Sequence, residues 1–457
     1  MLVSKDREQL RQEILEKVKQ YFHLVQSARN TPFVPGQTFI QYAGTVFDGQ
    51  EFVNAVDTLL GENICLGPYG QEFEKLMCQF FKSHDFIMVN SGSSANLVAV
   101  ATLCSKRLPG HLNRGDEVIT PAVTFPTTLT PILQNGLTPV FVDCELGTYN
   151  VDPDLVEGAI SNKTRAIMVP HTLGNPVDLD RLMALVKKYN LFLVEDACDS
   201  LGSTFDGRLV GTFGDLATLS MYPAHHITSG EGGGVVANRA PMGKIARSIR
   251  DWGRDCWCPP GKNDTCKKRF SHQSGDLPFG YDHKFVYSEL GYNLKPADTQ
   301  AAIAVAQYAK LPFIFEARRR NFRRLYEGLK DLQDFLILPR WHPRADPCWF
   351  GFPITLQKGV SRSHVIQWLQ EAKIDTRLIF AGNILRQPGF KGIPCRIYGS
   401  LERTDTIMMQ SFFLGVYPRI KDEMIDFIVE RLHSFFRQKR LPMAGFADKR
   451  QVMASGS

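Results

Sequence analysis

Residues 165–196 read RAIMVPHTLGNPVDLDRLMALVKKYNLFLVED, two short apolar runs on either side of a helical period. Between residues 179 and 189 the apolar side chains recur every three or four positions, which is typical of a helix with one buried face. The flanking runs contain the β-branched and apolar residues of buried strands. A strand, a helix and a second strand in this order predict a crossover unit on a parallel sheet.

The same alternation begins near residue 85 and continues through the runs FIMVN, DEVIT, TPVFV and DLATLSMY, without an internal repeat. We therefore expect an α/β protein with a large, mainly parallel-sheet domain over residues 41–315 and a small α+β C-terminal domain over residues 316–445. The long helical stretch at their boundary should kink or split at Pro312.

Three further segments differ from this pattern. Residues 1–40 predict an amphipathic, charged N-terminal helix or arm, and the small polar residues 446–457 predict a disordered tail. Residues 252–292 interrupt the alternation with Pro, Gly, Lys and Cys, so they predict an irregular insertion in the large domain.

Composition excludes several classes of protein. Of the 457 residues, 44% are hydrophobic and 22% charged, and a net charge of +6 over this length does not indicate a nucleic-acid partner. The longest uncharged stretch, residues 118–142, contains four prolines and does not predict a membrane helix. The N-terminus lacks the apolar core of a signal peptide, and ten cysteines without disulfide-module spacing indicate a reducing compartment. The sequence thus predicts a soluble, cytoplasmic protein that binds neither nucleic acid nor membranes.

Two motifs predict a ligand site at the carboxyl ends of the strands. In NSGSSAN (90–96) an apolar run ends and a helix begins, which places the backbone N–H groups of Gly92, Ser93 and Ser94 where phosphate binds. The same motif also fits a plain serine N-cap. In VEDACD (194–199), Asp196 ends a strand and lies where ligands bind. Glu195 and Asp196 could equally cap the next helix.

The ordered motifs SGSSAN, TFPTT, EDACDS, SMYPAHHITSGEGG and GYN resemble the vitamin B6-dependent nucleotide-sugar aminotransferases and dehydratases of the fold-type I, aspartate aminotransferase-like class. The resemblance covers roughly Gly44 to Arg431. It implies that Asp196 pairs with the cofactor's ring nitrogen, which keeps the ring an electron sink, and that Phe125 stacks on the ring. It further implies that Ser93, Ser94 and Ser220 hold the cofactor phosphate, and that Asn293 reaches the partner subunit's site in a homodimer.

One position departs from this family. Where its aminotransferases have the lysine that forms a Schiff base, this chain has His225, and histidine cannot form one. The resemblance therefore implies pyridoxamine 5'-phosphate held without a covalent bond, with His225 moving protons. A merely packed or capping His225 is disfavoured in an otherwise intact site, whereas His226 is expected to be structural.

Four cysteines form a second departure. Cys198, Cys256, Cys258 and Cys266 are separated by 57, 1 and 7 residues, and four thiolates suit either zinc or an iron–sulfur cluster. This spacing, with WGRDCWC and CKKRF, resembles the iron–sulfur 3-dehydratases that act on CDP- or dTDP-linked 4-keto-6-deoxysugars. The resemblance implies a 2Fe-2S cluster, and electrons from an NAD(P)H-dependent flavin and iron–sulfur reductase. We expect the insertion to fold over the active-site end of the sheet.

The expected function is C3 deoxygenation, dehydration followed by reduction, of a nucleotide-linked 4-keto-6-deoxyhexose in the biosynthesis of deoxysugars such as those of lipopolysaccharide O-antigens. The alternatives are a redox-free dehydratase with a structural zinc and a non-catalytic structural relative. Arg377 in TRLIFAGN is a candidate ligand for the substrate diphosphate, although an arginine there also suits a surface ion pair. The sequence leaves the nucleotide and the sugar stereochemistry open.

Overall fold

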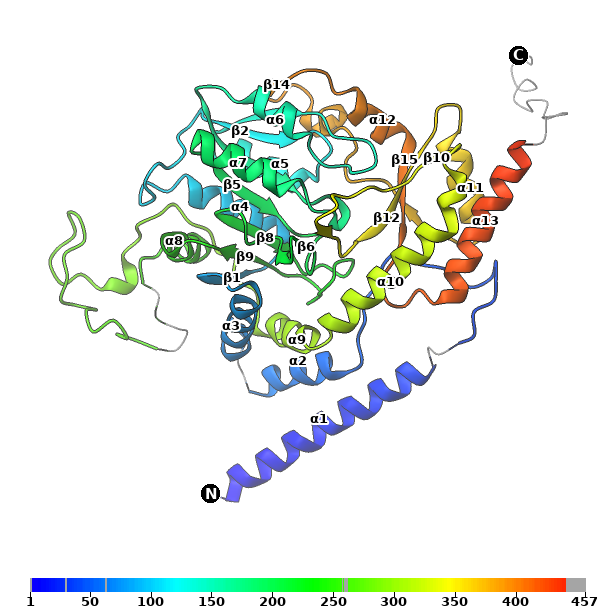
Figure 1. The fold of residues 1–457 in the computed structure, drawn as a ribbon. Coiled ribbons are helices and arrows are strands. Elements are labelled where there is room, and N and C mark those ends of the chain that lie inside the picture. Colours follow the sequence, from blue (N-terminus) through cyan, green and yellow to red (C-terminus); the bar gives the residue numbers. More distant parts are fainter. Residues whose placement is uncertain (1, 29–30, 62–63, 257, 259–261, 441–457) are drawn as a thin grey trace, which may run out of the picture.

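The computed structural model describes residues 2–28, 31–61, 64–256, 258 and 262–440 (Figure 1). Within them the largest sheet has eight strands in the order β1-β9-β8-β5-β4-β2-β3-β14, and only β9 runs antiparallel to its neighbours. The mainly parallel α/β sheet expected from the sequence is therefore confirmed. The strands are β1 (Asp85–Val89), β2 (Glu117–Pro121), β3 (Thr138–Val142), β4 (Thr164–Pro170), β5 (Phe192–Asp196), β8 (Leu216–Ser220), β9 (Gly233–Ala237) and β14 (Arg396–Ile397).

Helices cover both faces of this sheet. One face packs against apolar residues of α4 (Gly92–Leu103), α5 (Pro126–Gln134) and α8 (Ala240–Arg250). The other face is covered by α6 (Pro153–Ala159), α7 (Leu179–Tyr189), α3 (Pro68–Phe81) and α9 (Asp298–Tyr308). Apart from the short edge strand β14, the strands are consequently buried on both faces, which explains why they appear in the sequence as nearly continuous apolar runs.

Strand β9 is formed by the glycine-rich run, and glycine is required there for close packing. A Cβ on Gly233 would lie 2.3 Å from the backbone oxygen of Ser91, in the loop between β1 and α4. Glycine has low β-propensity, so the composition that permits this close approach also hides the strand from a sequence-based prediction.

A four-stranded sheet forms a second layer, in the order β10-β12-β15-β13. Its strands are β10 (Leu336–Ile337), β12 (Gly351–Leu356), β15 (Ser411–Gly415) and β13 (Thr376–Arg377), and its helices are α10 (Leu311–Leu329), α11 (Arg362–Glu371) and α13 (Asp422–Arg440). The long helical stretch is interrupted between α9 (Asp298–Tyr308) and α10, and Pro312 lies in the first turn of α10. Leu311 packs in the core of the large sheet and Leu325 in that of the small sheet, so α10 joins the two cores.

The C-terminal third of the chain also returns to the large sheet. β14 pairs with β3, and Ile384 packs with Leu129 and Phe141. The remaining short elements are β6 (Thr204–Phe205), β7 (Arg208–Leu209), β11 (Ala345–Asp346), α12 (Glu402–Gln410), η1 (Thr172–Gly174), η2 (His283–Phe285), η3 (Lys330–Leu332), η4 (Ile384–Arg386) and η5 (Pro388–Phe390).

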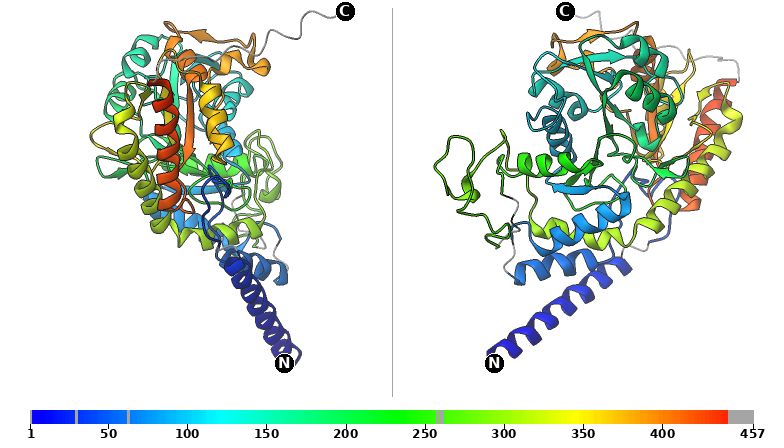
Figure 2. Two further views of the ribbon diagram at one scale, coloured as in Figure 1. Left: turned by 90° about the vertical axis from the view of Figure 1, so that its right-hand side faces the viewer. Right: turned by 60° about the vertical axis from the view of Figure 1, so that its left-hand side comes forward.

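Two segments project from the body. Helix α1 (Leu2–Ala28) leaves it beside α2 (Gln50–Leu60), where Arg11 and Asp57 form an ion pair of 2.6 Å. The insertion, residues 252–292, has η2 as its one regular element in the described part and stands apart from the body beyond α8 (Figures 1 and 2). Among the described residues, no helix is long and apolar enough to cross a membrane.

Candidate active site

A cavity of about 800 Å³, here called the central pocket, opens at the carboxyl ends of the parallel strands between the two sheets. Many of the residues singled out in the sequence line it: Gly92, Ser93, Phe125, Asp196, Cys198, Ser220, His225 and Arg377. Others lie outside its lining: Ser94, Asn293, Cys256, Cys258 and Cys266. Ligands of open α/β sheets bind at this end of the strands.

Asp196 is held at the bottom of the pocket by two polar side chains. Its Oδ2 accepts hydrogen bonds from Nδ2 of Asn96 (2.9 Å) and from the Thr128 hydroxyl (2.7 Å), and the side chain is buried. A carboxylate has about four lone-pair sites, so Asp196 can still accept an N–H from a ligand. Asn96 and Thr128 were not assigned from the sequence, although they belong to the motifs SGSSAN and TFPTT.

The neighbouring Glu195 points to the opposite side of the strand, as residues alternate along β5. It accepts hydrogen bonds from the backbone N–H groups of Gly211, Phe213 and Gly214 (2.7–2.8 Å) and from Nε2 of His171 (3.0 Å). Burial alone would raise the pKa of Glu195, but these donors hold it below its ordinary value. Glu195 is thus a structural anchor, and Asp196 alone of the two faces the pocket.

The beginning of α4 forms a cradle of backbone N–H groups beside β8. Ser91 is the N-cap and accepts from the Ser94 backbone (3.0 Å), while the Ser94 hydroxyl donates to Asn90 (2.6 Å). Ser94 therefore stabilises the turn, and the hydroxyls of Ser93 and Ser220 line the pocket. Ser91 was not assigned from the sequence.

Gly92 brings this helix terminus against β8. A Cβ on Gly92 would lie 2.6 Å from Cβ of Ser220, which is too close for any other residue without movement. The cradle and the serine hydroxyls at its rim have the chemistry of a phosphate site.

His225 lies in the turn that follows β8, on the pocket wall. Its Nδ1 is 3.3 Å from Oδ1 of Asp199, and its ring lies 5.2 Å from that of Phe350. The turn is fixed from behind by Arg318, whose guanidinium donates to the carbonyl oxygens of Ala224 (3.1 Å) and His225 (3.3 Å). Burial lowers the pKa of Arg318 to about 10. Asp199 and Arg318 were not assigned from the sequence.

His226 faces away from the central pocket. It is buried, and its Nε2 donates to the carbonyl oxygen of Cys348 (2.8 Å). Burial, reinforced by the nearby Arg318 charge, lowers the pKa of His226 well below its ordinary value. His226 is therefore a neutral packing residue in this structure.

Aromatic and basic side chains surround the mouth of the pocket. Phe125 is half exposed, and its ring lies 6.5 Å from that of Phe380. The Arg377 guanidinium stacks over Tyr42 at 4.2 Å and hydrogen-bonds to the Asp375 carboxylate. Arg377 thus lines the pocket and also takes part in a surface ion pair. Asn293 is exposed and outside the pocket of its own chain.

No lysine is among the described residues that line the central pocket. The residues present nevertheless fit a vitamin B6 phosphate: a cradle at a helix terminus for the phosphate, a buried carboxylate for the ring nitrogen, and an aromatic side chain at the mouth. What the described lining lacks is an amine to bind such a cofactor covalently.

The four cysteines do not meet within one chain. Cys198 lines the pocket, where burial and the adjacent Asp196 raise the pKa of its thiol well above the ordinary value. The other three lie on the insertion, where Cys258 contacts the Thr265 hydroxyl (3.0 Å) and Cys266 contacts Nδ1 of His283 (3.7 Å). Among the described residues, no three cysteine sulfurs lie within 4.8 Å of one another. A single chain in this conformation therefore does not offer a four-thiolate site, and the insertion does not cover its own pocket.

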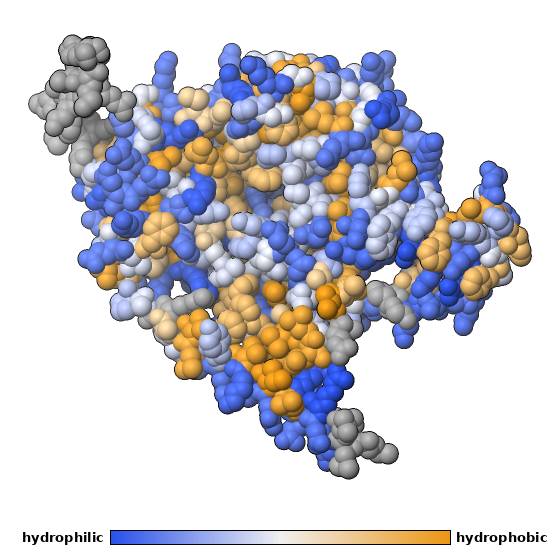
Figure 3. Space-filling view, turned by 180° about the vertical axis from the view of Figure 1, so that it is seen from behind, coloured by the Kyte–Doolittle hydropathy of each residue, from blue (hydrophilic) through white to orange (hydrophobic). Residues whose placement is uncertain are grey.

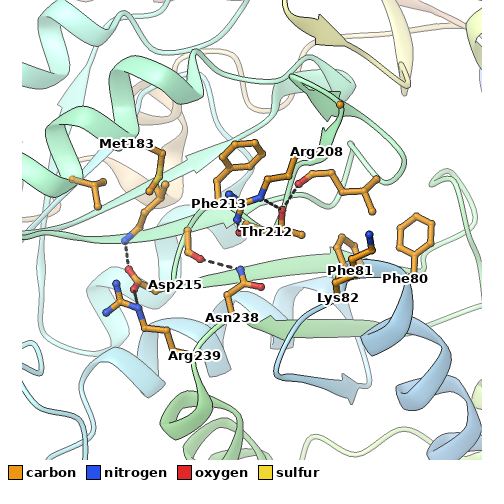
Figure 4. Close-up of a pocket in the computed structure, with 15 residues that line it drawn as sticks. Phe80, Phe81, Lys82, Met183, Arg208, Thr212, Phe213, Asp215, Asn238 and Arg239 are labelled. Atoms are coloured by element: carbon orange, nitrogen blue, oxygen red, sulfur yellow. Dashed lines mark hydrogen bonds and ion pairs between the residues drawn. The ribbon is translucent and has the colours of Figure 1, made fainter.

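A second cavity, of about 700 Å³, lies at the opposite end of the sheet (Figure 4). Its wall includes Asp215, which accepts from the backbone N–H of Leu193 at the start of β5 (2.8 Å) and pairs with Arg239 (2.7 Å). Asn238 closes the same region by donating to the carbonyl oxygen of Gly214 (2.9 Å). These contacts pair side chains and backbone groups near the beginning of β5 and β8. The second cavity shares no lining residue with the central pocket and is separate from the candidate active site.

Comparison with known proteins agrees with this geometry. The model of the DegT/DnrJ/EryC1/StrS aminotransferase family matches residues 47–433. The chain is 49% identical over 425 residues to dTDP-4-dehydro-2,6-dideoxy-D-glucose 3-dehydratase of Saccharopolyspora spinosa, covering 92% of this chain and 91% of that one. It is 47% identical over 430 residues to the lipopolysaccharide biosynthesis protein RfbH of Salmonella typhimurium, covering 93% and 98%.

Among solved structures, E. coli GDP-4-keto-6-deoxy-D-mannose-3-dehydratase with bound hydrated PLP superimposes with a TM-score of 0.78 at 30% identity, covering 86% of this chain and 99% of that one. This similarity confirms the expected fold of PLP-dependent aminotransferases. By its sequence, the chain belongs to the DegT/DnrJ/EryC1/StrS aminotransferase family.

Proposed function

We propose that this chain is a nucleotide-sugar 3-dehydratase that removes the C3 hydroxyl of a nucleotide-linked 4-keto-6-deoxyhexose with pyridoxamine 5'-phosphate as cofactor. The observation that carries the proposal is His225 in the wall of a pocket whose described lining contains no lysine. Relatives that are 3-dehydratases by name support it, and their names specify a dTDP-sugar in one case and a GDP-sugar in others. A plain aminotransferase is disfavoured, because its lysine is missing.

Each side chain has a role in this proposal. The beginning of α4, with Ser93 and Ser220, binds the phosphate, and Asp196 accepts the N–H of the ring nitrogen. Asn96 and Thr128 orient Asp196. When bound, the cofactor supplies an amine for the 4-keto carbon and a ring that withdraws electrons. Phe125 covers the ring and Arg377 at the mouth attracts the substrate diphosphate.

His225 is the proposed proton-transfer residue. Its Nδ1 faces Asp199, which leaves Nε2 free to take a proton from the cofactor's C4' carbon and to deliver one to the leaving hydroxyl. The negative charge of Asp199 stabilises the imidazolium that forms. Arg318, fixed to the carbonyl oxygens of the same turn, restricts the position of the imidazole.

Net C3 deoxygenation replaces one hydroxyl by one hydrogen, so one water leaves and two electrons and two protons are consumed. We propose that the electrons come from an NAD(P)H-dependent flavin and iron–sulfur reductase, and that Cys198, Cys256, Cys258 and Cys266 hold a 2Fe-2S cluster that receives them. We further propose that the enzyme is a cytoplasmic homodimer serving deoxysugar biosynthesis.

The test combines cofactor, substrate and metal. The anaerobically purified enzyme should bind pyridoxamine 5'-phosphate, and CDP-, dTDP- and GDP-linked 4-keto-6-deoxyhexoses can be ranked by their effect on its melting temperature. With a reductase and NADH, the best of these sugars should give a 3-deoxysugar, identified by mass spectrometry. An aminosugar as the product, or no binding of the cofactor, would contradict the proposal.

The metal is tested separately. A two-iron cluster absorbs in the visible range and zinc does not, so an anaerobic spectrum with metal analysis distinguishes them. Cys256→Ser should keep the fold and the proton exchange at C4' but lose formation of the 3-deoxysugar, whereas Cys395→Ser, outside the proposed ligands, should lose neither. Stoichiometric zinc, or an active Cys256→Ser enzyme, would contradict an electron-carrying cluster.

A further inference from the structure

The insertion cysteines and Cys198 lie toward opposite ends of helix α4. The helix begins at Gly92 in the central pocket, which Cys198 also lines. Asp255, the residue before Cys256, forms an ion pair of 3.1 Å with Arg107, beyond the C-terminal end of the helix. Because α4 has 12 residues, its two ends are about 18 Å apart. A cluster ligand set therefore cannot close inside one chain in this conformation.

Several contacts hold the base of the insertion beyond the C-terminal end of α4. The Ser105 hydroxyl donates to Glu289 (2.6 Å), and the backbone N–H of Ser288 donates to the Gly253 carbonyl oxygen (2.8 Å). A Cβ on Gly253 would lie 1.9 Å from the carbonyl oxygen of Glu289, so the outgoing and returning chains are in tight contact. Swinging the insertion back over its own pocket would break these contacts.

The projecting insertion carries large apolar side chains that the described part of the chain leaves exposed. Among them, Leu290 is 97% exposed and Phe279 74% exposed. Seen from behind, the insertion stands beside the body with apolar atoms on its surface (Figure 3). At the pocket mouth Phe125 and Tyr222 are also half exposed. Exposed apolar side chains that gather on a projecting segment and at a pocket mouth suit an interface.

We infer that the four-thiolate site is completed between two copies of this chain: Cys198 comes from one copy, and Cys256, Cys258 and Cys266 come from the insertion of the partner. The inference rests on the cluster in the proposed function. A two-fold axis makes the contact reciprocal, so a dimer contains two equivalent sites, each beside one central pocket. The insertion thereby brings its thiols to the second copy's pocket and buries its apolar side chains there.

Hybrid dimers distinguish this arrangement from a site within one chain. Cys198→Ser and Cys256→Ser chains, carrying different affinity tags, are coexpressed and the hybrid is isolated on both tags. If the site is completed between chains, the hybrid dimer keeps one complete set of four cysteine ligands. Its members are Cys198 of the Cys256→Ser chain and the three insertion cysteines of the Cys198→Ser chain. We expect about two irons per hybrid dimer and about four per parent dimer, with matching visible absorption. Each homodimer variant should have none.

The reciprocal hybrid pairs a parent chain with a chain carrying both substitutions. Completion between chains predicts no intact set and no iron, whereas a site within one chain predicts about two irons per dimer. A parent that binds iron as a monomer, or hybrids with the within-chain pattern, would overturn the inference. A dimeric parent without iron would instead overturn the proposed cluster. If a serine variant does not fold, Cys198→Ala and Cys266→Ala form an equivalent pair with the same expected pattern.

Discussion

Nδ1 of His225 lies 3.3 Å from Oδ1 of Asp199, although the two residues belong to different strand–turn units of the large sheet. Asp199 follows β5 and His225 follows β8, and these strands are neighbours in the sheet, so their following turns meet in the pocket wall. The pair places one imidazole nitrogen beside a carboxylate in the wall of the central pocket. Two predictions concern this pair.

His225→Asn should retain pyridoxamine 5'-phosphate, because none of the proposed phosphate- or ring-binding groups changes. Exchange of label from the cofactor's C4' carbon should fall by about 100-fold or more, since the general base is lost. Cofactor titration and exchange kinetics measure the two effects. His364→Asn, an exposed change on α11, is the matched control. Unchanged exchange in His225→Asn would exclude His225 as the base.

Asp199→Asn should lower the same exchange rate by about tenfold or more, because an amide no longer stabilises the charged imidazole. Cofactor affinity should change little, since Asp199 acts through His225. If the variant lost cofactor affinity and kept its exchange rate in the bound state, Asp199 would be a binding residue instead.

Borohydride should not fix pyridoxal phosphate to the parent enzyme, because its described pocket lining lacks a lysine amine. His225→Lys supplies an amine at the position in question, and borohydride should then produce one covalent adduct per chain. Peptide mass spectrometry locates the adduct. A stoichiometric adduct on the parent would show that another lysine reaches the cofactor.

The strands and the ligand motifs could be predicted because their signals are local. Burial on both faces gives continuous apolar runs, and SGSSAN and EDACDS combine a strand end with a turn. Asn96 and Thr128 lie within quoted motifs, but their joint contact with Asp196 depends on the spatial order of β1, β2 and β5, which no local pattern contains.

Other features depend on long-range packing. Arg318 lies in the middle of α10 and resembles any arginine of a charged helix until the turn at His225 packs against it. Strand β14 and the segment around Ile384 return to the large sheet from the C-terminal third of the chain. The direction of the insertion is set by Arg107 and Ser105, more than 140 residues before it. The cysteine spacing predicts one site formed by all four cysteines. In the structure, these contacts hold the insertion and its three cysteines away from Cys198.

Glu195 should make stability depend on pH. Burial alone would raise its pKa, but hydrogen bonds from His171 and backbone N–H groups hold the pKa below the ordinary 4.5. Because the pKa of Glu195 is lower in the folded than in the unfolded chain, its contribution to the free energy of unfolding is complete above pH 4.5. That contribution is lost as the pH falls below this value. Urea unfolding from neutral pH to below 4.5 should show that loss in the parent.

Glu195→Gln turns an N–H₂ group toward backbone donors, so it should cost about 1–3 kcal/mol at neutral pH and flatten the acid dependence. Glu430→Gln, exposed on α13, is the control and should do neither. If Glu195→Gln and the parent lost the same free energy of unfolding at acid pH, the loss would come from other carboxylates.

Gly92→Ala should weaken cofactor binding through the shape of the cradle alone. The added methyl would lie 2.6 Å from Cβ of Ser220 and 3.1 Å from its Cα, so the beginning of α4 must move away from β8. Overpacking of this kind costs about 1–3 kcal/mol, and part of that cost should fall on the phosphate site. We therefore expect the affinity for pyridoxamine 5'-phosphate to fall by about tenfold, equivalent to about 1.4 kcal/mol. Gly389→Ala adds the same methyl to another residue of the pocket wall, where it would meet nothing within 4 Å, and should leave the affinity unchanged. Equal affinities for all three proteins would mean that the phosphate does not bind at the beginning of α4.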